Sequence, residues 1–148
     1  MSAPVFVPMQ EADLDWVAAR EREIYAFPWS LNNFRDALSA GYSCWLMRDG
    51  ADAMGYGIVM RVLDEAHLLN ISIIPERQKQ GHGEKLLAFL KELAQQHGGS
   101  QMFLEVRASN LLAAGFYLRR GFSQIGLRKA YYPAAAGRED ALIMRCAL

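Results

Sequence analysis

The sequence predicts an α/β fold in which a mixed sheet of about seven strands carries four helices on its faces. Short runs of β-branched and aromatic residues, bounded by turn residues, predict the strands. Longer segments with apolar residues at a 3.6-residue period predict the helices. These segments follow one another in the order β-α-α-β-β-β-α-β-α-β-β, without a linker, a repeat or a low-complexity stretch. We therefore expect a single domain spanning residues 1–148.

Composition narrows the class of protein. Hydrophobic residues make up 52% of the chain, as in globular proteins, and 16 basic residues balance 16 acidic ones. A net charge of zero argues against a broad nucleic-acid-binding or membrane-binding surface. No apolar run approaches the ~20 residues that span a membrane, and the first four residues do not resemble a signal peptide. Cys44 and Cys146 lack metal or redox spacing, which predicts buried thiols in a cytoplasmic protein.

The first part of the chain predicts one strand and two helices. A strand covers Val5 to Pro8, and a helix with a periodic apolar face follows from about Glu11. Pro28 interrupts the helical pattern, and Ser30 can cap a second helix that runs to about Ala40. In the intervening loop, two aromatic residues either fill the core or form part of a substrate-binding wall: Phe27 and Trp29.

The remaining elements follow from turn residues and periodicity. Asp49-Gly50 predicts a hairpin turn, Gly98-Gly99 ends a helix, and Gly55 and Gly57 predict a bend or bulge in a strand. The expected strands cover residues 42–48, 53–63, 67–74, 102–106, 122–132 and 139–146. The expected helices cover residues 83–97 and a segment capped by Ser109 or Asn110 that ends near residue 120.

The segment from Asn70 to Leu87 is the most informative part of the sequence. Its apolar start predicts a buried strand, which Pro75 ends because proline lacks an N–H group. After a polar loop, Gly81 and Gly83 begin an amphipathic helix. The free N–H groups and the dipole of a helix N-terminus attract anions, and the absence of a Cβ lets a phosphate approach the backbone. A core helix that merely starts at glycine is the alternative.

The glycine spacing excludes two common phosphate-binding motifs. The P-loop pattern is absent, and the dinucleotide-binding pattern requires a third glycine where Leu86 stands. The pattern that remains, Gln78-x-x-Gly81-x-Gly83, resembles the acetyl-CoA pyrophosphate loop of the GCN5-related N-acetyltransferase (GNAT) superfamily. The order of predicted elements resembles that fold over essentially the whole chain.

Four further motifs narrow the resemblance. They are similar to the RimI-type ribosomal-protein-alanine N-acetyltransferases of bacteria, a family within the superfamily. The motifs are Ala26-Phe27-Pro28-Trp29-Ser30, Leu104-Glu105-Val106-Arg107-Ala108-Ser109-Asn110, Tyr117-Leu118-Arg119-Arg120-Gly121-Phe122, and Tyr131-Tyr132-Pro133 followed by Gly137-Arg138-Glu139-Asp140-Ala141.

The resemblance implies a role for each matching residue. Glu105 is implied as the general base and Tyr117 as the general acid. The alternatives are a solvated strand carboxylate for Glu105 and a core aromatic for Tyr117. The cofactor-binding residues it implies are Ile71, Ser72 and Ile73 beside the pantetheine arm, Lys79, Gln80, Gly81, His82, Gly83 and Glu84 around the pyrophosphate, and Asn110. No metal is expected, because the three histidines are scattered: His67, His82 and His97.

The resemblance also implies the acceptor, the N-terminal alanine of a small-subunit ribosomal protein. Tyr131, Glu139 and Asp140 are expected to line the acceptor cleft, or alternatively the two carboxylates only pair with neighbours or solvent. A lysine or small-amine acceptor is a second hypothesis, and a non-catalytic acyl-CoA sensor is a third. The presence of both Glu105 and Tyr117 disfavours the sensor.

Overall fold

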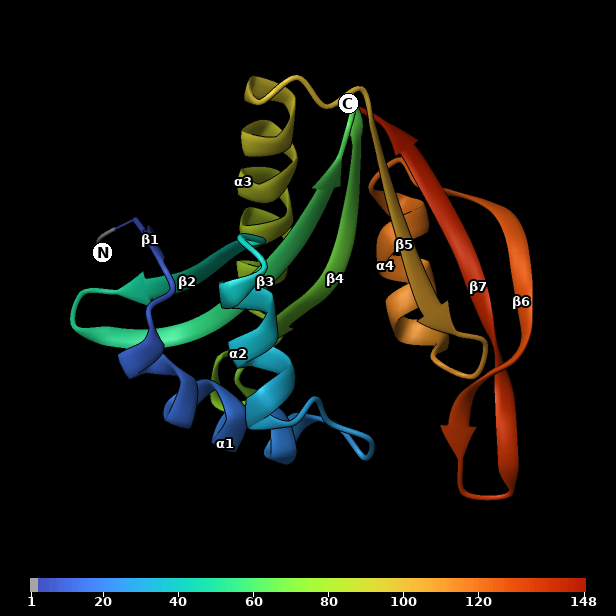
Figure 1. The fold of residues 1–148 in the computed structure, drawn as a ribbon, viewed down its shortest axis with the longest axis horizontal. Coiled ribbons are helices and arrows are strands. Elements are labelled where there is room, and N and C mark those ends of the chain that lie inside the picture. Colours follow the sequence, from blue (N-terminus) through green and yellow to red (C-terminus); the bar gives the residue numbers. More distant parts are fainter. Residues whose placement is uncertain (1–2) are drawn as a thin grey trace. The chain divides into compact units, whose positions relative to one another are not determined.

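The computed structural model describes residues 3–148 (Figure 1). Residues 1 and 2, which contribute to the expectation about a signal peptide, lie outside the described residues. The elements in chain order are β1 (Val5–Pro8), the 3₁₀ helix η1 (Glu11–Asp13), α1 (Leu14–Ile24), α2 (Leu31–Ser39), β2 (Ser43–Asp49), β3 (Asp52–Val62), β4 (Glu65–Ile73), the 3₁₀ helix η2 (Pro75–Arg77), α3 (His82–Gln96), β5 (Gln101–Arg107), α4 (Leu111–Arg119), β6 (Ser123–Ala134) and β7 (Gly137–Ala147).

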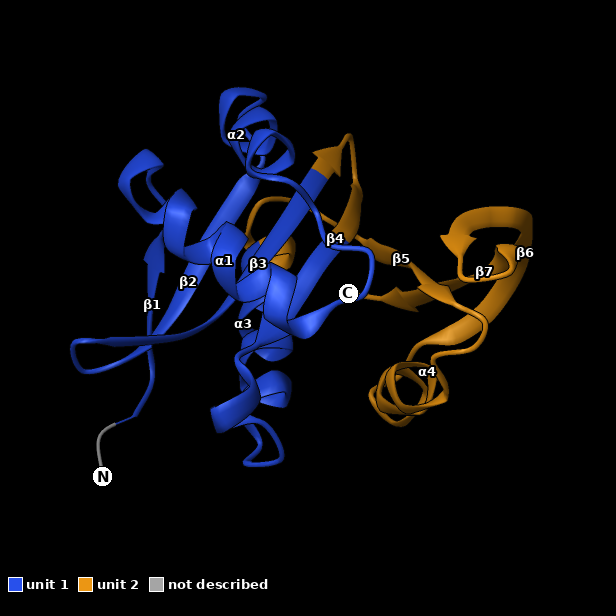
Figure 2. Ribbon diagram, turned by 90° about the horizontal axis from the view of Figure 1, so that it is seen from below, with its two compact units in different colours: residues 1–60, 69–93 blue, residues 61–68, 94–148 orange. Residues whose placement is uncertain are grey.

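The predicted fold class is confirmed. Within residues 3–148, seven strands form one mixed sheet in the order β1-β2-β3-β4-β5-β7-β6, and four α-helices accompany them. β4 and β5 are parallel, whereas β1–β2, β2–β3, β5–β7 and β6–β7 are antiparallel. The chain forms two compact units: unit 1 comprises residues 1–60 and 69–93, and unit 2 comprises residues 61–68 and 94–148 (Figure 2).

In unit 1, helices cover both faces of the sheet. Successive strand residues point to opposite faces, and Cys44 and Leu46 of β2 belong to a buried cluster with α1 and α2. Trp45, between them, contacts Phe89 of α3 at a ring-centroid distance of 5.0 Å. Phe6 of β1 stacks on the same ring at 4.2 Å. α1 and α2 therefore pack on one face and α3 on the other.

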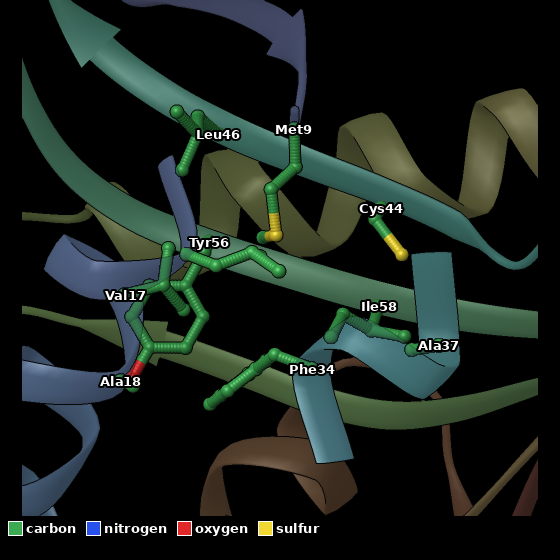
Figure 3. Close-up of a cluster of buried hydrophobic side chains, with 10 residues drawn as sticks. Met9, Val17, Ala18, Phe34, Ala37, Cys44, Leu46, Tyr56 and Ile58 are labelled. Atoms are coloured by element: carbon green, nitrogen blue, oxygen red, sulfur yellow. The ribbon is translucent and has the colours of Figure 1, made fainter. Parts of the chain in front are cut away.

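The cluster under α1 and α2 forms the core of unit 1 (Figure 3). Its helical members recur at the spacing that aligns side chains on one helix face. It consists of Met9, Leu14, Val17, Ala18, Phe34, Ala37, Cys44, Leu46, Tyr56 and Ile58. Trp29 packs against this cluster, whereas the Phe27 side chain is 45% exposed. Of the two loop aromatics, Trp29 therefore contributes to the core, whereas Phe27 is exposed.

Glycines in β3 permit close packing around this strand. A Cβ on Gly55 would lie 2.8 Å from the carbonyl oxygen of Ser72, and a Cβ on Gly57 would lie 2.7 Å from Leu90. The strand irregularity predicted from these glycines is also present, as a shift of the β2–β3 register between Met47 and Arg48. The interior of unit 1 therefore needs these residues to lack a side chain.

Unit 2 has a clear division between the two faces of its strands. Met102, Leu104 and Val106 of β5 are buried, and they alternate with half-buried residues that include Glu105 and Arg107. On β7, Ile143 lies opposite Glu105. We call the face that carries these residues the Glu105 face; it consists of Phe103, Glu105 and Arg107 of β5, Ala141, Ile143 and Arg145 of β7, and Gly126 and Arg128 of β6.

The element boundaries differ from expectation by a few residues at most. α3 begins at His82 and ends at Gln96, each one residue earlier than predicted. The last hairpin is longer than expected, since β6 continues to Ala134 and β7 starts at Gly137. The strands extend because the backbone of the Pro133 region still pairs with Arg138. Cys44 and Cys146 are both buried thiols that form no disulfide, as predicted.

Candidate functional site

The loop before α3 has the geometry of an anion-binding turn. Lys79 and Gly81 have φ angles of +61° and +85°, which turn the backbone sharply into the helix. The amide of Lys85 donates to the carbonyl of Gly81 at 3.3 Å, and the preceding amides of the first turn lack acceptors within the helix. A Cβ on Gly81 would meet nothing within 4 Å. The backbone is thus open to a ligand, and the residues present fit a phosphate group.

Two side chains link this loop to its surroundings in unit 1. Gln78 donates from Nε2 to the carbonyl oxygen of Ile73 at 2.9 Å, so the first residue of the glycine motif fixes the loop to the end of β4. His82 contacts Gln80 through Nε2 at 3.2 Å. Its Nδ1 is buried and has no hydrogen-bond partner among the described residues. That nitrogen is available to a ligand at the start of α3.

The end of β4 is held by side chains from α1 and its following loop. The hydroxyl of Tyr25 donates to the carbonyl of Ile71 at 3.2 Å and lies 2.7 Å from the hydroxyl of Ser72. Burial raises the pKa of Tyr25 to about 12. Ser72 is buried and donates to Asn70 at 2.7 Å. The Ser72 hydroxyl is therefore a structural group, and the predicted role of residues 71–73 in binding the acetyl donor stays a prediction.

A buried carboxylate that sequence reasoning missed lies behind this strand. Glu21 is only 2% exposed. It accepts hydrogen bonds from Tyr56 at 2.8 Å, from Asn70 at 3.1 Å and from the backbone N–H of Trp29 at 3.0 Å. A signal was present in the sequence, because Glu21 follows Ala18 by three residues on the apolar face of α1. A charged residue at a core position indicates a hydrogen-bonded role.

Glu105, the predicted base, lies at the centre of the Glu105 face of unit 2. Its side chain is 27% exposed, and its Oε1 lies 3.2 Å from Nε of Arg128. Its Oε2 is buried and has no hydrogen-bond partner in the part of the chain that the structure describes. Burial, followed by the charge of Glu105, raises the pKa of Tyr132 to about 12. The sequence contained no signal for Arg128 or Tyr132 as neighbours of Glu105.

The carboxylates of the last hairpin both make hydrogen bonds within unit 2. Glu139 accepts from Nη1 of Arg107 at 2.9 Å and from the backbone N–H of Ser109 at 3.3 Å. Hydrogen bonds from Ser109 and Arg107 hold the pKa of Glu139 below its ordinary value. Asp140 accepts from the N–H of Ala130 at 2.8 Å. Their roles in acceptor binding stay predictions, as does that of Tyr131, which is 42% exposed.

The remaining predicted site residues are placed by α4. Asn110 caps this helix, since its side chain accepts from the N–H of Ala113 at 3.1 Å. The half-buried ring of Tyr117 contacts Phe116 and Phe122 edge-on at 5.3 and 5.5 Å. Both aromatic neighbours orient the ring of Tyr117.

The structure thus gathers the predicted residues into two groups. In unit 1 the end of β4 and the glycine loop belong together, and in unit 2 the strand carrying Glu105, the helix carrying Tyr117 and the last hairpin belong together. Residues 3–148 contain no group of three or more His, Cys, Asp or Glu side chains placed to hold a metal ion. None of the described helices is long and apolar enough to cross a membrane.

Comparison with known proteins gives one consistent answer. The profile of the acetyltransferase (GNAT) family matches residues 9–122. The chain is 37% identical over 136 residues to the [ribosomal protein bS18]-alanine N-acetyltransferase of Escherichia coli K12, covering 92% of each chain. It is 33% identical over 141 residues to the enzyme of that name from Haemophilus influenzae, covering 95% of this chain and 96% of that one.

Solved structures agree with the sequence comparison. The crystal structure of the ribosomal-protein-S18-alanine N-acetyltransferase from E. coli has a TM-score of 0.91 and 34% identity, covering 98% of this chain and 94% of that one. Ard1 from Thermoplasma volcanium shares the fold, with a TM-score of 0.89 at 18% identity over 99% of both chains. The resemblance inferred from the glycine loop and the four motifs is confirmed. The chain therefore belongs to the acetyltransferase (GNAT) family.

Proposed function

We propose that this protein transfers the acetyl group of acetyl-CoA to the N-terminal α-amine of a ribosomal protein that begins with alanine. The observation that carries the proposal is the 37% identity, over 92% of both chains, to an enzyme named for acetylating the alanine of ribosomal protein bS18. The match covers nearly the whole chain, so it includes the segments that carry Glu105, Tyr117 and the glycine loop.

The chemistry of the amine favours an α-amino acceptor. Only a neutral amine has the lone pair that attacks a thioester. An α-amino group with a pKa near 7.7–8.0 is roughly a tenth to a fifth neutral at pH 7, whereas a lysine near 10.4 is neutral only to about 0.04%. A carboxylate base of ordinary strength can therefore serve an N-terminus with little thermodynamic penalty.

In the proposed reaction the amine nitrogen attacks the thioester carbonyl carbon. The new C–N bond forms and the C–S bond breaks, so the acetyl group moves from sulfur to nitrogen. One proton of the amine passes to Glu105, whose Oε2 is buried and free of hydrogen bonds among the described residues. The departing CoA thiolate takes a proton from the hydroxyl of Tyr117. The products are the N-acetylated N-terminus, in which the amine has become an amide, and the neutral CoA thiol. Exchange of protons with solvent then returns Glu105 and Tyr117 to their starting states.

Unit 1 supplies the proposed binding residues for the acetyl donor. The amides of Gly81, His82 and Gly83 would contact the pyrophosphate at the start of α3, where the helix dipole favours negative charge. The backbone of Ile71–Ile73 would pair with the pantetheine arm. The positive φ of Gly81 and the unpartnered Nδ1 of His82 support this assignment. The side chain of Glu84 is exposed and would contribute only its backbone.

Unit 2 supplies the proposed acceptor-binding residues. Tyr131 is exposed on the last hairpin, and Glu139 and Asp140 fix the hairpin through Arg107, Ser109 and Ala130. Because Arg107 already compensates the charge of Glu139, the shape of the hairpin contributes more to acceptor binding than free negative charge does.

The test compares two sets of peptides with labelled acetyl-CoA. One set begins Ala-Arg with a free N-terminus, and the other has a blocked N-terminus and an internal lysine. We expect acetylation of the free N-termini, with activity reduced in Glu105→Gln and partly restored at higher pH, where more amine is already neutral. Preferred acetylation of the blocked lysine peptides would contradict the proposed acceptor. In a further comparison, free N-terminal peptides with an acidic second residue should react at rates similar to the Ala-Arg set. A strong preference for the basic peptides would contradict only the inference that hairpin shape outweighs free negative charge.

A further inference from the structure

The two oxygens of the Glu105 carboxylate have different environments. Oε1 is paired with Nε of Arg128 at 3.2 Å, and the Arg128 side chain is 53% exposed. Oε2 is buried and unpartnered among residues 3–148. A buried carboxylate oxygen without a hydrogen bond is unfavourable. The two oxygens of a carboxylate are chemically equivalent, so the ion pair with Arg128 acts by fixing the plane of the group, which leaves one oxygen without a partner among residues 3–148.

The strand register explains why Arg128 reaches Glu105. Glu105 on β5 and Gly126 on β6 both lie opposite Ile143 of β7. Arg128 is two residues beyond Gly126 and therefore points to the same face. With β7 between them, the two backbones are roughly 10 Å apart, since adjacent strands are spaced by about 4.8 Å. Only a long side chain can span that distance.

A bulge in β6 supports Arg128. The β6–β7 register shifts between Arg128 and Tyr132, and Ala130 within the bulge has a φ of +51°. In a regular strand Arg128 and Tyr131 would point to opposite faces, but here the guanidinium lies 5.0 Å from the centre of the Tyr131 ring. This cation–π contact stabilises one position of the Arg128 side chain.

Two side chains from β7 hold the bulge itself. Asp140 accepts from the N–H of Ala130 at 2.8 Å. Arg138 donates to the carbonyl oxygens of Ala130 and Tyr131, also at 2.8 Å. These hydrogen bonds to the N–H group of Ala130 and to the carbonyl oxygens of Ala130 and Tyr131 fix the backbone of the bulge. The bulge in turn fixes where the Arg128 side chain lies.

We propose that Arg128 is a positioning residue for acetyl transfer: it binds Oε1 of Glu105 and keeps Oε2 turned to accept the proton of the acceptor amine. The inference rests on the proposed function of Glu105 as the base. Arg128 itself does not touch the reacting atoms in this role.

The kinetic test compares three variants of Arg128 with a matched control on the same strand. Arg128→Gln should lower kcat by about tenfold, a part of the 10²–10⁴-fold that a general base supplies, while KM for acetyl-CoA stays unchanged. Arg128→Lys should keep part of the rate. In Arg128→Ala, added guanidinium chloride should restore part of it. Lys129→Gln removes the neighbouring exposed charge and should behave as wild type.

A second measurement needs no acceptor. The carboxyl carbon of Glu105 is labelled with ¹³C and identified by its loss in Glu105→Gln. Its NMR chemical shift at neutral pH should change in Arg128→Gln, because Oε1 loses its contact with the guanidinium. Lys129→Gln should leave this chemical shift in place. A purely structural role for Arg128 would alter the melting temperature without changing the chemical shift.

The outcomes separate this inference from the proposed acceptor. If the wild type acetylates some other amine, the proposed acceptor fails and the Arg128 comparison is made with that amine. If Arg128→Gln matches Lys129→Gln in rate and in the chemical shift of Glu105, or gains rate, the positioning role is overturned while N-terminal acetylation stands. Full activity of Glu105→Gln would overturn both the base assignment and the role of Arg128.

Discussion

The hydroxyl of Tyr56 donates a hydrogen bond of 2.8 Å to the carboxylate of Glu21, and both side chains are almost fully buried. Burial, reinforced by the Glu21 charge, raises the pKa of Tyr56, so this hydroxyl stays a donor throughout the physiological range. The same carboxylate also accepts hydrogen bonds from Asn70 and Trp29. One charged residue thus connects α1, β3, β4 and the loop before α2.

This arrangement predicts a large effect of Glu21 on stability. Glu21→Ala would leave two buried donors, on Tyr56 and Asn70, and the half-buried N–H of Trp29 without this acceptor. The loss should cost about 3 kcal/mol or more. In a double-mutant cycle with Tyr56→Phe, the coupling should be about 1–2 kcal/mol. Urea unfolding measures both. Glu92→Ala, at an exposed position on α3, should change stability by less than about 0.5 kcal/mol. An equally small effect of Glu21→Ala would contradict the hydrogen-bond assignment.

The loop before α3 predicts a specific effect on binding of the acetyl donor. Gly81 and Gly98 have φ angles of +85° and +89°, and a Cβ at either would meet nothing within 4 Å. Alanine at either position should therefore cost about 1–2 kcal/mol of backbone strain. A strain of about 1.4 kcal/mol changes the equilibrium between the binding conformation of the loop and its alternatives by about tenfold, so the Kd for acetyl-CoA should rise by up to about tenfold. Calorimetry should show this rise for Gly81→Ala and an unchanged Kd for Gly98→Ala.

Tyr117→Phe should reduce turnover without weakening donor binding. The substitution keeps the ring that packs against Phe116 and Phe122 and removes only the proton donor. We expect kcat to fall by about 100-fold, with an unchanged Kd for acetyl-CoA. An acetyl donor with a more acidic thiol should lose less, because its thiolate leaves without needing a proton. Tyr42→Phe, at a half-buried position packed against the core of unit 1, is the control. A wild-type kcat with chemistry rate-limiting would exclude Tyr117 as the acid.

The raised pKa of Tyr132 predicts that the folded protein loses stability at alkaline pH. Its pKa is raised in the folded state from 10.0 to about 12, first by burial and then by the charge of Glu105. The unfolded chain therefore ionises at lower pH, so this contribution is complete below about pH 10 and is lost as the pH rises towards 12. Tyr132→Phe should flatten the decrease of the urea midpoint over this range.

The pKa of Tyr132 also reports on the nearby charge of Glu105. Removing the nearby charge with Glu105→Gln should lower the pKa of Tyr132, as followed by phenolate absorbance. Tyr25, whose pKa is also raised to about 12 by burial, should titrate as before and serves as the internal control. An unchanged Tyr132 titration would show that the Glu105 charge has no influence on it.

Local sequence was sufficient for most of the secondary structure. Ser30 caps α2 as predicted, because its hydroxyl accepts from the N–H of Asn33 at 3.1 Å. Pro75 ends the sheet strand and starts the short helix η2. Asn110 caps α4. Each of these features depends on residues within three or four positions of one another, so sequence patterns can reveal them.

The glycine motif likewise depended on local sequence, and its family assignment was confirmed. The positive φ that Gly81 adopts is a backbone conformation for which glycine is suited. The strand, the loop and the helix that form this site are contiguous from Asn70 to Leu87. A contiguous site can be read from one stretch of chain.

Only the tertiary structure decided the partners of the charged residues. Glu21 meets Tyr56 across 35 positions of sequence, and the Arg128–Glu105 pair spans a strand that lies between them. These contacts depend on strand order and register, and a slip of one residue turns every side chain to the opposite face. The β6 bulge adds a further shift that brings Tyr131 to Arg128. The sequence determined which elements form and which family they belong to, whereas the packing of distant strands determined which side chains meet, because register is set by long-range contacts.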